Sequence, residues 1–117
     1  MLTIEEKTQA VVAALEDIKA QDIEIIDTSK LSSLFERMVI ASAQSTRQTK
    51  ALADHVEVQL KARGATVLGV EGGDGGEWVL VDLGDVIVHI MQPAVRVYYN
   101  LEELWGAKPK MRTQAAK

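Results

Sequence analysis

The feature that most constrains the fold is a pair of strongly β-forming runs separated by a two-residue turn. Residues 78–83 (WVLVDL) and 86–91 (VIVHIM) are rich in β-branched and aromatic side chains, and Gly84-Asp85 between them suits a tight connection. The sequence therefore predicts a hairpin. Because side chains alternate along a strand, Trp78, Leu80 and Asp82 share one side of the first run.

Helix-start signals place the other main elements. Thr3 and Glu6 have capping-box spacing ahead of an apolar stripe, so a helix is expected to begin there. Ser45 and Gln48 repeat this spacing, and the stripe that follows ends at Gly64, a residue suited to the left-handed conformation past a helix end. A second long helix is expected over this segment.

Strand signals occupy much of the remaining chain. Residues 22–27, 38–41 and 66–70 are predicted strands, residues 28–33 a turn or short helix, and residues 72–76 a flexible glycine-rich connection. Residue 93, a proline, suits the first turn of a short helix, and residues 101–105 form a last amphipathic turn. This order predicts an α/β (α+β) fold with a mixed sheet of about five strands covered by helices, and leaves the strand order open.

Composition and charge set limits on location and partners. The 117 residues suit a single domain, which we place at residues 1–106, followed by a basic flexible tail at 107–117. There is no cysteine, no export-type start and no apolar run of about 20 residues, so we expect a cytoplasmic, soluble protein without a membrane span. Four of the 13 basic residues lie in the tail. Residues 1–106 therefore hold nine basic and 17 acidic side chains, and their net charge is near −8. Direct nucleic-acid binding by this body is disfavoured.

No constellation of catalytic or metal-binding residues stands out. The glycines of residues 72–76 precede a strand, whereas a phosphate-binding loop needs glycines that open a helix. Residues 42–45 faintly resemble a nucleotidyltransferase turn, but the following strand, residues 66–70, lacks the two acids that would bind magnesium. His55 and His89 have no evident third ligand; we expect His55 beside the helix stripe and His89 to be partly buried and bonded to a neighbour. We predict no enzyme activity, cofactor or metal.

An interface is the alternative that the residues favour. Either helices cover both sides of the strand at residues 78–83, or one side leaves an apolar strip, rimmed by acids, that a basic partner could cover. Four of the five aromatic residues lie in the final third of the chain, which favours an interface there. The four are Trp78, Tyr98, Tyr99 and Trp105.

These motifs, taken together, resemble the ribosomal silencing factor (Iojap) family over about residues 4–106. The matching positions, in order, are Ser45-Thr-Arg47-Gln48, Ala53-Asp54, Glu71-Gly72, Trp78, Asp82-Leu-Gly84-Asp85, Val88-His89, Arg96 with Tyr99, and Leu101-Glu102-Glu-Leu104-Trp105. The resemblance implies a nucleotidyltransferase-like fold without the catalytic metal acids. It also implies binding to ribosomal protein fourteen of the large ribosomal subunit, which blocks joining of the small subunit and represses translation under nutrient limitation. Glu36 and Ala43 depart from the aspartate and glycine common in the family.

The partner-binding residues expected on this basis are Trp78, Asp82 and Leu80, followed by a second group. The second group comprises Glu71, Asp85, Arg96 and Tyr99, for which a structural role in the hairpin and last helix is the alternative. Two other functions stay open: a nucleotide-binding or nucleotidyltransferase-like enzyme using residues 42–48, and a large-subunit assembly factor that uses the same contact. Monomer and weak homodimer also stay open, since exposed apolar surface near the end could self-associate.

Overall fold

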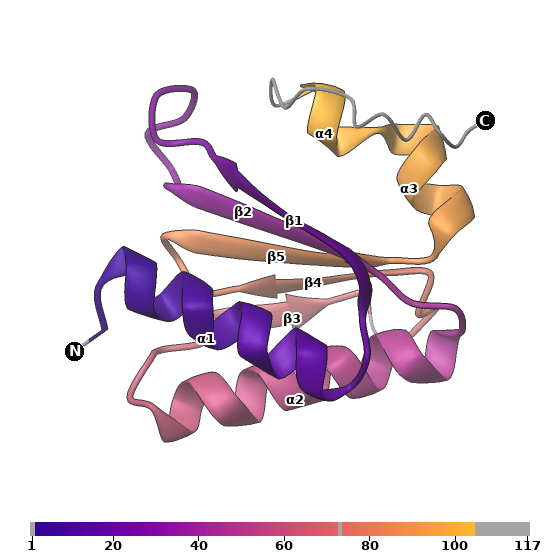
Figure 1. Ribbon diagram of the computed structural model, residues 1–117, viewed down its shortest axis with the longest axis horizontal. Coiled ribbons are helices and arrows are strands. Elements are labelled where there is room, and N and C mark those ends of the chain that lie inside the picture. The colour runs from indigo at the N-terminus through magenta and orange to yellow at the C-terminus, as the bar shows by residue number, and fades with distance from the viewer. Residues whose placement is uncertain (1, 73, 105–117) are drawn as a thin grey trace.

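A single five-stranded mixed sheet organises the chain (Figure 1). The computed structural model describes residues 2–72 and 74–104, and the strand order is β1-β2-β5-β4-β3. The strands are β1 (Gln21–Asp27), β2 (Arg37–Ser42), β3 (Gly69–Glu71), β4 (Trp78–Asp82) and β5 (Val86–Met91). Among the strand pairs of these described residues, the central β2–β5 pair is parallel and the other three are antiparallel. The predicted α+β class is confirmed, and β4 and β5 form the expected antiparallel hairpin.

Two long helices cover one face of this sheet, α1 (Ile4–Asp17) and α2 (Thr46–Ala62) (Figure 1). Val11 and Leu15 of α1 and Leu52 and Val56 of α2 are fully buried, and they belong to the larger apolar core under this face. Complete burial of one such side chain contributes about 1.5–3 kcal/mol. The helices are therefore held mainly by their apolar stripes, as the sequence pattern predicted.

The capping box predicted at the start of α1 is present, whereas at the start of α2 one of its two hydrogen bonds is formed. Thr3 and Glu6 exchange both bonds of a capping box. Ser45 does accept from the Gln48 backbone N–H, but the Gln48 side chain accepts from the Gln44 N–H and donates to the carbonyl of Ile18. Gln48 thus connects α2 to the chain after α1 instead of completing the box.

The third strand is shorter than expected and starts later. The strand predicted at residues 66–70 is observed at Gly69–Glu71, where it pairs with β4. Ala65 and Val67 pack against the core outside any strand, and the Leu68 N–H already donates to the Asp82 carbonyl of β4 just before β3 begins. After β3 the chain turns sharply: Gly72 has φ 89° and a Cβ there would lie 2.1 Å from the Trp78 carbonyl oxygen.

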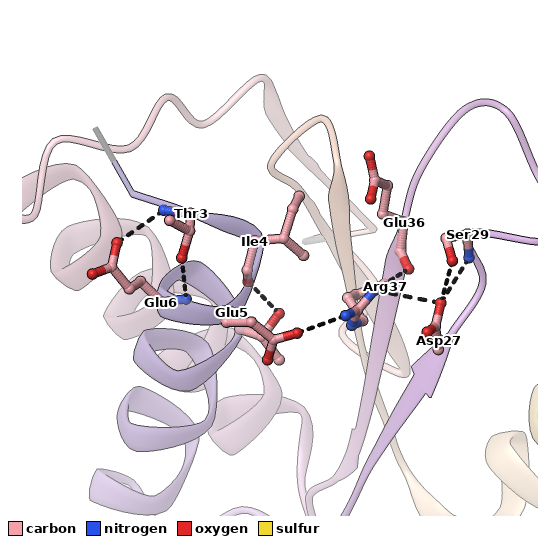
Figure 2. A network of polar contacts seen from close by, with 9 residues as sticks. Thr3, Ile4, Glu5, Glu6, Asp27, Ser29, Glu36 and Arg37 are labelled. Carbon is pink, nitrogen blue, oxygen red and sulfur yellow. Dashed lines mark hydrogen bonds and ion pairs between the residues drawn. The ribbon is translucent and has the colours of Figure 1, made fainter.

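A polar network ties the start of α1 to the β1–β2 edge (Figure 2). The Arg37 guanidinium lies 2.7 Å from a carboxylate oxygen of Glu5 and 3.4 Å from one of Asp27. The Ser29 hydroxyl and backbone N–H donate to Asp27 and, with Arg37, lower the pKa of that carboxyl below its ordinary value. This network orients α1 relative to the sheet edge that carries β1.

Two short helices complete the described chain on the other side of the sheet (Figure 1). α3 (Pro93–Tyr99) begins with a proline, as predicted, and α4 (Leu101–Leu104) follows after Asn100, which adopts a left-handed conformation with φ 50°. No helix within the described ranges has the length and apolarity needed to cross a membrane. The tail expected at residues 107–117, and Trp105 before it, lie outside the described residues.

Candidate functional site

The two faces of the β4–β5 hairpin have different surroundings. Val79 and Val81 point toward α1 and α2 and are 1% and 0% exposed. Trp78, Leu80 and Asp82 point to the opposite face, where all three remain partly exposed. Helices therefore lie on both sides of the sheet, but α3 and α4 leave Trp78, Leu80 and Asp82 partly exposed, as expected for an open strip.

Strand register places further side chains on this open face. Leu80 lies opposite Glu71 of β3 on one side and opposite His89 of β5 on the other. Asp82 lies opposite Ile87, which is also partly exposed. Directly opposed residues share a face of a sheet. We refer to Glu71, Trp78, Leu80, Asp82 and Ile87 as the open strip.

Ile87 is the residue that the sequence interpretation missed. It shares a strand face with His89 and Met91, and its position opposite Asp82 follows from the hairpin register. The signal was present, because a two-residue turn at Gly84-Asp85 fixes which residues face each other. Ile87 extends the apolar part of the open strip beyond Leu80.

An aromatic cluster lies at the Trp78 end of the open strip. The Trp78 indole N–H donates to Nδ1 of His89 at 2.9 Å. The Tyr99 ring from α3 lies 4.8 Å from the Trp78 ring, centroid to centroid, and Tyr98 contacts Tyr99 edge-on at 5.0 Å. Such tilted and edge-on pairs are favourable arrangements for aromatic rings. The cluster gives the strip a large, oriented apolar end.

His89 is a neutral part of this cluster. It is 7% exposed, and burial lowers its pKa from 6.5 to about 4. The prediction of a partly buried, bonded histidine is confirmed, with Trp78 as the partner. His55, in contrast, lies at the α1–α2 contact, where its Nε2 is 3.0 Å from an Asp17 carboxylate oxygen.

Arg96 occupies a buried position on α3. Its Nε and Nη2 donate to Glu102 at 3.0 and 2.8 Å, and its Nη1 donates to the Ser42 hydroxyl at 2.8 Å. These contacts join α3, α4 and the end of β2. Arg96 is 9% exposed, so in the described structure its role is to hold the two short helices on the sheet.

The predicted acidic residues are divided between two locations. Asp82 and Glu71 lie on the open face, and Asp82 also accepts from the Gly84 backbone N–H at 2.8 Å, which caps the hairpin turn. Asp85 instead forms a 2.7 Å ion pair with Lys7 of α1. The structure therefore brings Trp78, Leu80, Asp82, Glu71 and Tyr99 together and places Asp85 with α1.

The strand-to-helix junction at residues 42–48 is occupied by internal contacts. Ser42 is 2% exposed and accepts from Arg96, while Ser45 caps α2. Among the described residues, no group of three or more His, Cys, Asp or Glu side chains could hold a metal ion. Ser42, Ser45 and Gln48 of this junction thus take part in contacts within the fold.

Comparison with known proteins shows which family has this sequence and fold. The family described as ribosomal silencing factor during starvation matches residues 2–117. The chain belongs to the ribosomal silencing factor family. A ribosomal silencing factor of Chromobacterium violaceum is 55% identical over 117 residues, covering 99% of this chain and 96% of that protein. The resemblance seen in the sequence motifs is confirmed.

A solved structure and more distant relatives extend the comparison. A crystal structure of a protein from Chromobacterium violaceum superposes with a TM-score of 0.90 at 55% identity, covering 92% of this chain and 90% of that one. A mouse protein named mitochondrial assembly of ribosomal large subunit protein 1 is 33% identical over 80% of this chain and 42% of its own length. The maize chloroplast protein Iojap is 34% identical over 80% of this chain and 40% of its own length.

Proposed function

We propose that this protein binds the large ribosomal subunit through ribosomal protein fourteen of that subunit. The bound protein then blocks joining of the small subunit and lowers translation when nutrients are short. The observation that carries the proposal is the open strip, in which Trp78, Leu80 and Ile87 form a partly exposed apolar centre beside Glu71 and Asp82. Family membership supplies the ribosomal context.

The mechanism that we propose is steric exclusion without a chemical step. A standard protein interface covers about 800 Å² on each partner and has an apolar centre with a polar rim. A partner face covered in this way is no longer accessible to the small subunit. The protein would act in the cytoplasm, where the subunits join.

Charge should contribute mainly to the rate of encounter. Residues 1–106 hold nine basic and 17 acidic side chains, so the body is attracted to basic protein surfaces and repelled by exposed phosphates. We therefore expect a basic contact region on the ribosomal protein, with no direct RNA contact by the folded body. Added salt should slow association by screening this attraction.

A second candidate is a role in assembly of the large subunit. The name of the mouse relative supports it, since that protein is described as an assembly protein for the mitochondrial large subunit. The same open strip would make the contact in both cases. The two candidates differ in whether the mature subunit is prevented from joining its partner.

Co-sedimentation with purified large subunits and a subunit-joining assay test the proposal together. We expect the wild-type protein to sediment with large subunits, to bind isolated ribosomal protein fourteen, and to reduce formation of complete ribosomes. Leu80→Arg should abolish all three effects, because it puts a charge in the apolar centre of the strip. Val58→Arg is the matched control: Val58 is a 60% exposed apolar residue on α2, away from the strip.

The outcomes separate the candidates. Subunits that join and translate equally fast with a molar excess of the protein would refute silencing by exclusion. Binding to large subunits without an effect on joining would favour the assembly role. A titration calorimetry experiment with magnesium nucleotides tests the enzyme alternative, which requires saturable binding near residues 42–48.

A further inference from the structure

The Trp78–His89 pair is a directional side-chain contact between the two strands of the hairpin. The Trp78 indole N–H points at His89 Nδ1 across 2.9 Å, and the two ring centroids are 5.8 Å apart. Trp78 is partly exposed on β4, whereas His89 is buried on β5, diagonally across the hairpin. The partly exposed ring is thus anchored by a group that is itself buried.

The chemistry of the two rings fixes the state of His89. An indole N–H can only donate, so His89 Nδ1 must accept, and the imidazole must be neutral with its proton on Nε2. The low pKa that burial gives His89 agrees with this state over the neutral pH range. The acceptor is therefore always present under ordinary conditions.

A second contact limits Trp78 from another direction. Tyr99 of α3 lies 4.8 Å from the Trp78 ring, at an interplanar angle of 48°. With the hydrogen bond to His89 and the ring contact with Tyr99, the indole has one favoured orientation. Freezing a large side chain before binding removes an entropic cost that would otherwise weaken association.

We propose that His89 is a positioning residue for partner binding: its Nδ1 holds the Trp78 indole in the orientation in which the open strip meets its partner. The proposal rests on the proposed function, and it adds a buried residue that does not itself touch the partner. It predicts that affinity depends on the acceptor at position 89 even though that position lies beneath the surface.

Two substitutions separate the acceptor from the shape of the ring. In His89→Asn, the side-chain oxygen occupies nearly the position of Nδ1 and can accept from the indole. His89→Phe keeps the ring volume but offers no acceptor, and it leaves the indole N–H without its partner. A purely packing role for His89 predicts the opposite order, with Phe tolerated better than Asn.

The test combines a spectrum of the free protein with a binding measurement. The NMR resonance of the Trp78 indole N–H is assigned by comparison with Trp78→Phe. In the wild type this proton should exchange slowly with solvent. Its chemical shift should change little in His89→Asn, whereas in His89→Phe the shift should change and the exchange should be faster. Binding to purified large ribosomal subunits should weaken about three- to tenfold in His89→Phe, the size expected for one lost hydrogen bond. His89→Asn should bind within about twofold of wild type, since the acceptor remains.

Each outcome has a defined meaning. An unmoved indole resonance in His89→Phe, or wild-type affinity of that variant, overturns the positioning role. If His89→Phe does not unfold cooperatively, the wild-type protein alone tests the proposal. A Trp78 indole N–H that exchanges with solvent as fast as that of free tryptophan also overturns the positioning role. Failure of the wild-type protein to bind large subunits refutes the proposed function instead, and the indole resonance still decides whether His89 orients Trp78.

Discussion

The buried ion pair between Arg96 and Glu102 gives the sharpest test of how the aromatic end of the open strip is held. Both side chains are close to 10% exposed, and the guanidinium makes two bonds of 2.8–3.0 Å to Glu102 and one of 2.8 Å to Ser42. α3 has seven residues and α4 has four, so neither helix is stable alone. The pair is therefore expected to hold both helices on the sheet.

The expected cost follows from what each change leaves behind. Removing one member of a buried pair typically costs about 3–5 kcal/mol, because the other charge stays buried. Ser42 continues to accept from Arg96, and the Gln amide oxygen remains as a neutral acceptor, so we expect about 2–3 kcal/mol for Glu102→Gln. The double variant Arg96→Met/Glu102→Leu buries no charge and should lie within about 1 kcal/mol of wild type.

Urea and thermal unfolding followed by circular dichroism measure these differences. For a domain of this size, a loss of 2–3 kcal/mol corresponds to a fall in melting temperature of about 10 °C. The single variants Arg96→Met and Glu102→Leu and the double variant Arg96→Met/Glu102→Leu form a cycle whose coupling energy should exceed about 1.5 kcal/mol. Additive effects, with a coupling energy near zero, would refute the reasoning that this pair joins α3 and α4 to β2.

Four further predictions concern other parts of the molecule. Leu80→Arg should weaken co-sedimentation with large subunits more than a hundredfold while Val58→Arg leaves it unchanged; equal losses would remove the open strip from consideration. Gly72→Ala should destabilise by at least about 2 kcal/mol because of its positive φ and the clash with the Trp78 carbonyl, whereas Gly75→Ala, with open space around it, should not; a matched pair of melts decides. As the pH drops from 6.5 to about 4, the free energy of unfolding should fall by about 3 kcal/mol because of His89. In that pH range the histidine binds a proton in the unfolded chain but not in the folded one. Parallel urea titrations of His89→Asn should lack this part of the pH dependence. Sedimentation equilibrium should detect weak self-association of the wild-type protein, because the Tyr98 ring on α3 is 81% exposed. Tyr98→Ser should reduce this association, and a strictly monomeric wild type would contradict the prediction.

The elements that could be predicted from sequence are those with local signals. Thr3 and Glu6 lie one helical turn apart and satisfy each other's backbone amides, so the start of α1 needs no information from the rest of the chain. The same holds for the hairpin, where Gly84 has φ 90° between two β-branched runs. The position of Trp78, Leu80 and Asp82 on one face also follows, because alternation along a strand is local.

The parts that could not be predicted depend on distant partners. The parallel pairing of β2 with β5 brings together residues about 50 positions apart, and no local pattern encodes it. Asp85 looked like the other acids of its segment, yet Lys7, 78 residues away, holds it against α1. Gln48 fits the capping-box pattern, but its side-chain oxygen accepts from the Gln44 backbone N–H, and its NH2 group donates to the carbonyl of Ile18, 30 residues away.

The open strip owes its rigidity to elements that belong to the core. Leu80 and Ile87 sit on strands whose alternate residues, Val81 and Val88, are completely buried under α1 and α2. A side chain on such a strand cannot move far without disturbing the core, so little backbone ordering remains to oppose binding. Differences in affinity among variants of the strip should therefore appear mainly as differences in dissociation rate, whereas changes to the acidic rim should alter the association rate and its dependence on salt.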